Sequence, residues 1–148
     1  SREEKILEKD EFDKPVTKKG LGWSLSFWIY VDDWTYKYDK NKYIILWDDN
    51  LAIWLPQKKN ELNIEIPIFE TRCGLTSERI VYSGIPLQKW LHVTIILEQR
   101  NLDLWINGKL YSSRYLKNIP KQKPINNMEI CLCRSERFLP SPCKIHTI

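Results

Sequence analysis

The chain has 148 residues, of which 43% are hydrophobic and 28% charged, proportions that fit one folded domain and exclude a disordered chain. No apolar run approaches the roughly 18 residues that a membrane-spanning helix needs, so we expect no membrane insertion. The net charge of +4 comes without a dense stripe of lysine and arginine or a recognition motif, so we expect no nucleic-acid partner.

The first twenty residues are highly charged, contain Pro15 and show little hydrophobic periodicity. This is typical of a charged N-terminal segment or of one short edge strand. A regular pattern of apolar residues begins just after residue 20 and continues to the end of the sequence. We therefore expect one folded domain over residues 21–148, preceded by the segment 1–20.

Residues 22–31, GWSLSFWIYV, are the first clear strand of this domain. Large apolar residues occupy every second position, and this alternation predicts a β-strand. The other face carries Trp28 and Tyr30 beside its serines. We therefore expect this strand to be central in its sheet and covered on both sides.

Three further strands follow in the middle of the chain. Residues 42–47 and 51–55 are separated by the turn-forming sequence Asp-Asp-Asn. Residues 61–69 show the most regular alternation of all. Pro67 places this strand near a sheet edge or at a strand end, because proline has no backbone N–H to donate.

Asn107-Gly108 predicts a tight hairpin, because both residues tolerate a positive φ. Amphipathic helical runs with caps are absent from the sequence. About nine or ten short strands with frequent turns predict an all-β fold, a two-sheet antiparallel β-sandwich. The remaining predicted strands are residues 79–83, 90–99, 101–106, 128–133 and 143–148.

Two blocks, GWSLSFWIYV and IPLQKWLHVTIILEQRNLDLWINGKL, resemble the concanavalin A-like jelly roll in its laminin-G and pentraxin branch. The terminal FLPSPCKIHTI is similar to the closing strand of that family, with Pro142 where glycine is frequent. The resemblance covers roughly residues 20–148 and implies a ligand-binding module flanked by other domains. It also implies a glycan or protein ligand, frequent assistance by calcium, and a location outside the cell or at its surface. A shared fold does not by itself identify the ligand.

Alternating aromatic residues just beyond the first strand are the candidate sugar platform, because flat rings stack on the apolar faces of sugars. They would otherwise cover the open end of the sandwich. Two lysine clusters would favour an anionic glycan, or simply belong to a solvated surface. The aromatic residues are Trp34, Tyr36 and Tyr38, and the clusters are Lys37, Lys40 and Lys42, and Lys117, Lys121 and Lys123.

Asp48, Asp49 and Asn50 are the best local cluster of oxygen ligands for calcium, although these residue types also simply form turns. Asp32 and Asp33 are their candidate partners from another loop. The family resemblance implies a metal among the rim loops, where these turns would fall. We expect no required cofactor and name calcium as the one candidate.

Glu61, Asn63 and Glu65 resemble the Glu-x-Asp-x-Glu strand of the related β-glucanases, with asparagine in place of the central aspartate. A retaining glycosidase needs two carboxyls roughly 5–5.5 Å apart. Four strand rises separate these two Cα atoms by roughly 13 Å. A solvent-facing strand face is therefore the simpler interpretation, and glycoside hydrolysis the remote one.

Four cysteines leave the redox compartment open. Cys131, Cys133 and Cys143, with His146, have the ligand types of a zinc site. A disulfide from Cys143 and buried free thiols are the alternatives, and the sequence leaves the state of all four, Cys73 included, undetermined.

The best-supported function from sequence is a non-catalytic module that binds a glycan through rim loops. The alternative is a protein-interaction or assembly domain that uses a sheet face or an edge strand, which exposed Trp90 and Trp105 on one face would favour. His92 lies inside a strand and has no companion nucleophile, and no phosphate loop or nucleophile elbow is present. We therefore do not expect an enzyme.

Overall fold

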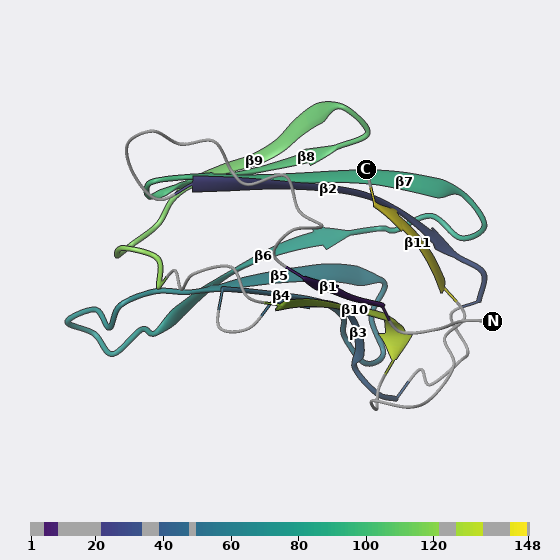
Figure 1. Cartoon of the computed structure of the whole chain (residues 1–148), viewed down its shortest axis with the longest axis horizontal. Coiled ribbons are helices and arrows are strands. Elements are labelled where there is room, and N and C mark those ends of the chain that lie inside the picture. The colour runs from purple at the N-terminus through teal and green to yellow at the C-terminus, as the bar shows by residue number, and fades with distance from the viewer. Residues whose placement is uncertain are drawn as a thin grey trace.

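The structure, a computed structural model, describes residues 5–8, 22–33, 39–47, 50–121, 127–134 and 143–147. Within these ranges every regular element is a strand, and there is no helix that could cross a membrane. The strands form two stacked layers (Figure 1). They are β1 (Lys5–Glu8), β2 (Gly22–Val31), β3 (Lys42–Trp47), β4 (Leu51–Leu55), β5 (Glu61–Pro67), β6 (Ser77–Ser83), β7 (Trp90–Glu98), β8 (Asn101–Ile106), β9 (Lys109–Tyr115), β10 (Asn127–Arg134) and β11 (Cys143–Thr147).

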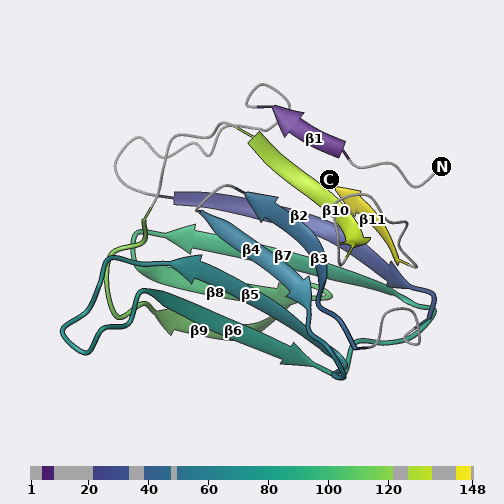
Figure 2. The ribbon, with the colours of Figure 1, turned by 90° about the horizontal axis from the view of Figure 1, so that it is seen from below.

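One sheet has six strands in the order β1-β10-β3-β4-β5-β6, and the other has five in the order β11-β2-β7-β8-β9. All the pairs within each sheet are antiparallel. The chain passes from one sheet to the other after β1, β2, β6, β9 and β10, and Figure 2 shows β1 at the far edge of the six-stranded sheet. The two-sheet antiparallel β-sandwich predicted from the sequence is confirmed.

The core lies between the sheets because alternate residues of each strand point inward. The register of β2 and β7 places Phe27 opposite Val93 and Ile29 opposite Leu91, and all four side chains are buried. Each side chain of this size contributes roughly 1.5–3 kcal/mol when it is removed from water.

The Asn107-Gly108 hairpin is confirmed. Both residues have positive φ, 50° and 76°, as a two-residue turn with right-handed strand twist requires. The side-chain Oδ1 of Asn107 also accepts a hydrogen bond from the backbone N–H of His92 at 2.9 Å. The turn thereby fixes the end of β8 against β7.

One detail of the predicted strands needs correction, and one alternative is decided. β2 is central, between β11 and β7, but only its inner face is fully buried, and Trp28 and Tyr30 remain half-buried on the outer face. Pro67 is the last residue of β5, so the strand-end alternative is confirmed, and β5 lies between β4 and β6 rather than at a sheet edge. At the end of a strand, the missing backbone N–H of proline does not interrupt the ladder.

Candidate functional site

Much of the predicted rim lies outside the described residues. Trp34, Tyr36, Tyr38 and Lys37 fall there, as does Lys123, so the aromatic platform stays a prediction. Lys40 is described and exposed.

Lys42 differs from the expected ligand-binding lysine, because it is only 2% exposed. Its ammonium group donates to the carbonyl of Lys40 at 3.1 Å. Burial lowers the pKa of Lys42, and the nearby charge of Asp39 opposes that shift. The side chain is thus engaged within the fold and adds nothing to an exposed basic surface.

Of the three residues predicted to bind calcium, only Asn50 lies within the described residues. Asp48 and Asp49 lie outside the described residues, and Asn50 is fully buried, with its backbone N–H donating to the Trp47 carbonyl at 2.8 Å. No group of three or more His, Cys, Asp or Glu side chains gathers as a metal cluster in the described part of the chain. Calcium binding by residues 48–50 therefore stays a prediction.

Glu61, Asn63 and Glu65 share the outer face of the six-stranded sheet, but this face is not simply solvated. Asn63 is 3% exposed and lies between Trp54 on β4 and Val81 on β6. The expectation of a solvent-facing strand face is wrong at this position, because large neighbours on both adjacent strands cover the amide.

Glu65 is already engaged. One of its carboxylate oxygens accepts a hydrogen bond from the Ser77 hydroxyl at 2.8 Å and lies 3.8 Å from the Arg79 guanidinium. Arg79 in turn stacks over the Trp54 ring at 4.8 Å. These partners hold Glu65 to its neighbours on β6.

Among the cysteines, Cys73 is a free, exposed thiol. It lies in the segment between β5 and β6. The zinc and disulfide alternatives concern Cys131, Cys133, Cys143 and His146. The structure describes the backbone of these four residues, in β10 and β11, but not their side chains, so the alternatives stay open.

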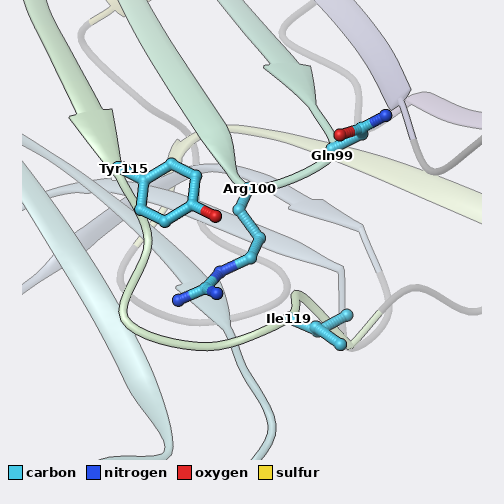
Figure 3. A pocket seen from close by; sticks show the side chains of 4 residues that line it. All are labelled: Gln99, Arg100, Tyr115 and Ile119. Atoms are coloured by element: carbon cyan, nitrogen blue, oxygen red, sulfur yellow. The ribbon is translucent and has the colours of Figure 1, made fainter.

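A pocket lies at the end of the sandwich where β7 turns into β8, opposite the end at which β2 finishes. Gln99, Arg100, Tyr115 and Ile119 line its volume of about 240 Å³. In Figure 3, Arg100 runs from the turn towards the segment after β9, and the hydroxyl of Tyr115 points towards it. The volume lies below the roughly 300–1,000 Å³ of drug-sized sites and suits one small ring.

Arg100 fixes the shape of this pocket. Its Nε and Nη2 both donate to the carbonyl of Leu116, at 3.0 and 2.6 Å, and its guanidinium lies 4.5 Å from the centre of the Tyr115 ring. The Leu116 N–H donates back to the Arg100 carbonyl at 2.7 Å. The turn and the segment after β9 are thereby held together.

The pocket combines a cation, an amide, an apolar side chain and an aromatic ring that is 69% exposed at Tyr115. Lys117 and Lys121, two of the predicted basic residues, are exposed on the same segment. A small polar ligand with one apolar face fits this chemistry. The sequence pattern indicated these two lysines, but it carried no signal for the four lining residues.

Trp90 and Trp105 lie on the same face, the outer face of the five-stranded sheet, as the protein-interaction alternative would require. Trp105 pairs with Thr94, which lies on the same face of β7 as Trp90. Trp90 is half-exposed, whereas the indole nitrogen of Trp105 is enclosed and has no partner in the described part of the chain. His92 lies on this face as well, where its Nε2 is 2.7 Å from the Ser26 hydroxyl.

Comparison with known proteins gives structural neighbours only. No protein-family model and no curated protein matches the sequence. The binding domain of botulinum neurotoxin serotype D is similar in fold, with a TM-score of 0.72 over 99% of this chain and 36% of that one, at 14% identity.

Two structures of the binding domain of botulinum neurotoxin DC are also similar, each at 21% identity over 74% of this chain and 27% of the other. The one in complex with rat synaptotagmin II has a TM-score of 0.57, and the one in complex with SialylT has a TM-score of 0.56. The chain thus spans about a quarter to a third of these neighbours. Identities this low show the shared β-sandwich fold alone, and none of these structures is named as concanavalin A-like.

Proposed function

We propose that this domain is a non-catalytic module that binds a glycan. The observation that carries the proposal is the pocket at the β7–β8 turn, where the exposed Tyr115 ring stands beside the Arg100 guanidinium. A sugar ring offers an apolar face to such an aromatic side chain and hydroxyls to the neighbouring polar groups. The exposed Lys117 and Lys121 would favour an anionic glycan.

The structural neighbours support a binding role in general terms. They are binding domains, one solved with a protein, synaptotagmin II, and one with SialylT. The aromatic residues within 34–38, which follow β2 in the sequence, stay a second predicted place for a glycan. We infer that both ends present loops on a rigid sandwich, the usual division between scaffold and recognition.

The absence of catalysis is part of the proposal. Glu65, which a glycosidase would need, is held by Ser77 and Arg79, and the amide between the two glutamates is buried. Glu65 is therefore not presented to a substrate as a free carboxyl. If the domain cleaved a glucan and Glu61→Gln abolished that cleavage, the proposal that it is not catalytic would be contradicted.

A glycan array, run with calcium and with chelator and at low and high salt, tests the proposal. We expect binding that Tyr115→Ala weakens about tenfold, the equivalent of about 1.4 kcal/mol. Trp90→Ala is the control, because Trp90 is a half-exposed aromatic residue outside the pocket, at the other end of β7.

An equal loss of glycan binding with both variants would show that the pocket is not the binding site. A folded protein that binds no glycan on the array would contradict the proposal and favour the protein-interaction alternative. Binding that chelator abolishes would support the predicted calcium ligands at residues 48–50.

A further inference from the structure

Phe69 and Ile119 face solvent side by side, next to the pocket at the β7–β8 turn. A short antiparallel ribbon joins the residues after β5 to the segment after β9. In it Ile68 pairs with Pro120, and the Phe69 N–H donates to the Ile119 carbonyl at 2.9 Å. Ile68 and Pro120 are buried, whereas Phe69 is 53% and Ile119 47% exposed. Because cross-strand partners share one face of a ribbon, the Phe69 and Ile119 side chains are neighbours on its outer face.

Ile119 also connects this outer face to the pocket. Its side chain lines the pocket together with Tyr115, the most exposed of the three at 69% (Figure 3). Phe69, Ile119 and Tyr115 are therefore linked into one exposed surface, with Ile119 between the two aromatic residues. We call these three residues the aromatic end surface.

Each of the two exposed rings has a cation beside it. The Arg100 guanidinium lies 4.5 Å from the centre of the Tyr115 ring, and the Lys121 ammonium lies 5.9 Å from the centre of the Phe69 ring. Lys121 follows Ile119 by two residues along the ribbon, so both side chains lie on the same face. The structure thus repeats one arrangement, an exposed ring with a cation over it, at two neighbouring points.

Basic residues outnumber acidic ones in the three stretches that build this end, residues 67–72, 98–101 and 115–121. They are Arg72, Arg100, Lys117 and Lys121, against Glu70 and Glu98. Two further carboxylates are already bonded. Glu78 accepts the backbone N–H of Lys117 at 2.7 Å, and Asp103 accepts the hydroxyl of Ser113. The exposed charge at this end therefore favours an anionic ligand.

Arg100 still has donors to offer such a ligand. A guanidinium has five N–H donors. Two of them bind the Leu116 carbonyl, and no acceptor among the described residues takes the other three. A flat ring beside N–H donors suits a sugar, which presents an apolar face together with hydroxyl and acidic groups. Lysine is depleted at protein–protein interfaces, which disfavours an acidic peptide.

We propose that the aromatic end surface binds an anionic oligosaccharide, with one sugar unit stacked on Tyr115 and a further unit on Phe69. This inference rests on the proposed function, because the pocket beside Tyr115 supplies the first of the two subsites. The pocket of about 240 Å³ suits one small ring, so further units of a bound chain lie outside it, where Ile119 leads to Phe69. Two linked contacts hold a chain more tightly than one.

Isothermal titration calorimetry with the 148-residue chain tests the second subsite. The probes are length series, from disaccharide to octasaccharide, of hyaluronan, which carries carboxylates, and of heparin, which carries sulfates as well. Neutral maltooligosaccharides of the same lengths are the comparators. We expect the longest anionic probes to bind at least about tenfold more tightly than the shortest, and to weaken as salt is raised. Comparison of the two anionic series shows whether carboxylates suffice.

Variants assign the increase with length to Phe69. Phe69→Ala should weaken binding of the longest probe about tenfold and remove most of the increase, whereas Tyr115→Ala should weaken every length. Phe69→Tyr keeps a ring and should bind as the parent chain does. Lys121→Gln should weaken binding of the anionic probes about fivefold.

Two control variants lie away from the aromatic end surface. Trp90→Ala removes a half-exposed ring at the other end of β7, and Lys59→Gln removes one exposed charge just before β5, at the opposite end of that strand from Phe69. Both should bind every probe as the parent chain does. Unchanged melting curves show that each variant is folded.

The outcomes separate this inference from the proposed function. Affinity that does not rise with length, or Phe69→Ala that binds as the parent while Tyr115→Ala does not, would overturn the second subsite and leave the pocket in place. Neutral probes that bind as tightly as the anionic ones would overturn the anionic ligand, and equal binding of polyglutamate would favour an acidic peptide. If none of the probes binds, the inference is wrong, and the glycan array decides the proposed function separately.

Discussion

The guanidinium of Arg114 on β9 donates a hydrogen bond of 2.7 Å to the backbone carbonyl of Arg79 on β6. These strands are the edges of the two different sheets, so this bond ties the sheets together along one open side of the sandwich. Tyr82 and Tyr111 form a second tie between the same strands, with ring centroids 4.9 Å apart at 82°. An edge carbonyl that is already bonded cannot accept a strand from another molecule.

Arg114→Ala should therefore loosen this side and leave the Arg79 carbonyl open to strand pairing. We expect a loss of about 0.5–1.5 kcal/mol in the free energy of unfolding by urea, the usual contribution of one hydrogen bond. We also expect more self-association in sedimentation experiments. Arg72→Ala, an exposed arginine outside these ties, is the control and should change neither measurement.

The fold was predictable because its signals are local and repeated. The alternation in residues 22–31 and 90–99 fixes which side chains face inward, and a slip of one residue would expose Phe27 and Val93 together. Asn107-Gly108 likewise needs nothing but its own two residues to define a turn. Such features can be predicted from the sequence without knowing which strands pair with one another.

The pocket was not predictable in the same way. Arg100 comes from a turn, while Leu116 and Ile119 come from the segment after β9, and no periodic pattern links them. The burial of Asn63 was missed for a similar reason, because Trp54, which covers it, belongs to another strand. An arginine in a tight turn is a signal for such a clamp, but the sequence does not indicate which carbonyl it binds.

Lys42→Met should stabilise the domain at neutral pH, by roughly 0.5–1 kcal/mol, because a buried ammonium costs free energy that a thioether does not. Burial lowers the pKa of Lys42 below its ordinary value of 10.5, with Asp39 opposing. The folded state thus releases this proton before the unfolded state does, so the parent chain gains stability as pH rises from the lowered pKa towards 10.5.

Urea unfolding of the two chains at a series of pH values measures this effect. The advantage of Lys42→Met should be full at neutral pH and shrink above the lowered pKa. An advantage that is constant across the whole range would contradict the assignment to lysine ionisation.

Cys73 should be alkylated at lower pH than an ordinary thiol. The Thr71 hydroxyl, 3.1 Å from its sulfur, lowers the pKa of the Cys73 thiol, with help from the backbone of Leu75. Thr71→Val should move the midpoint of the alkylation rate to higher pH, whereas Thr71→Ser keeps the hydroxyl and should leave the midpoint in place. Mass spectrometry of the peptide that contains Cys73 follows this thiol alone, and identical midpoints for valine and serine would refute the role of the hydroxyl.

Asn63→Leu should raise stability, although it removes a polar residue from a strand. The side-chain Nδ2 of Asn63 is buried and has no hydrogen-bond partner in the described part of the chain. An unsatisfied buried donor costs roughly 1–3 kcal/mol, and leucine fills a similar volume without that cost. We expect a gain of about 1 kcal/mol or more in the free energy of unfolding by urea. Asn101→Leu places the same apolar side chain at an exposed position and should give no gain. If Asn63→Leu instead destabilised the domain, the amide would have to be bonded in solution, and the outer face of the six-stranded sheet would have to open enough to admit its partner.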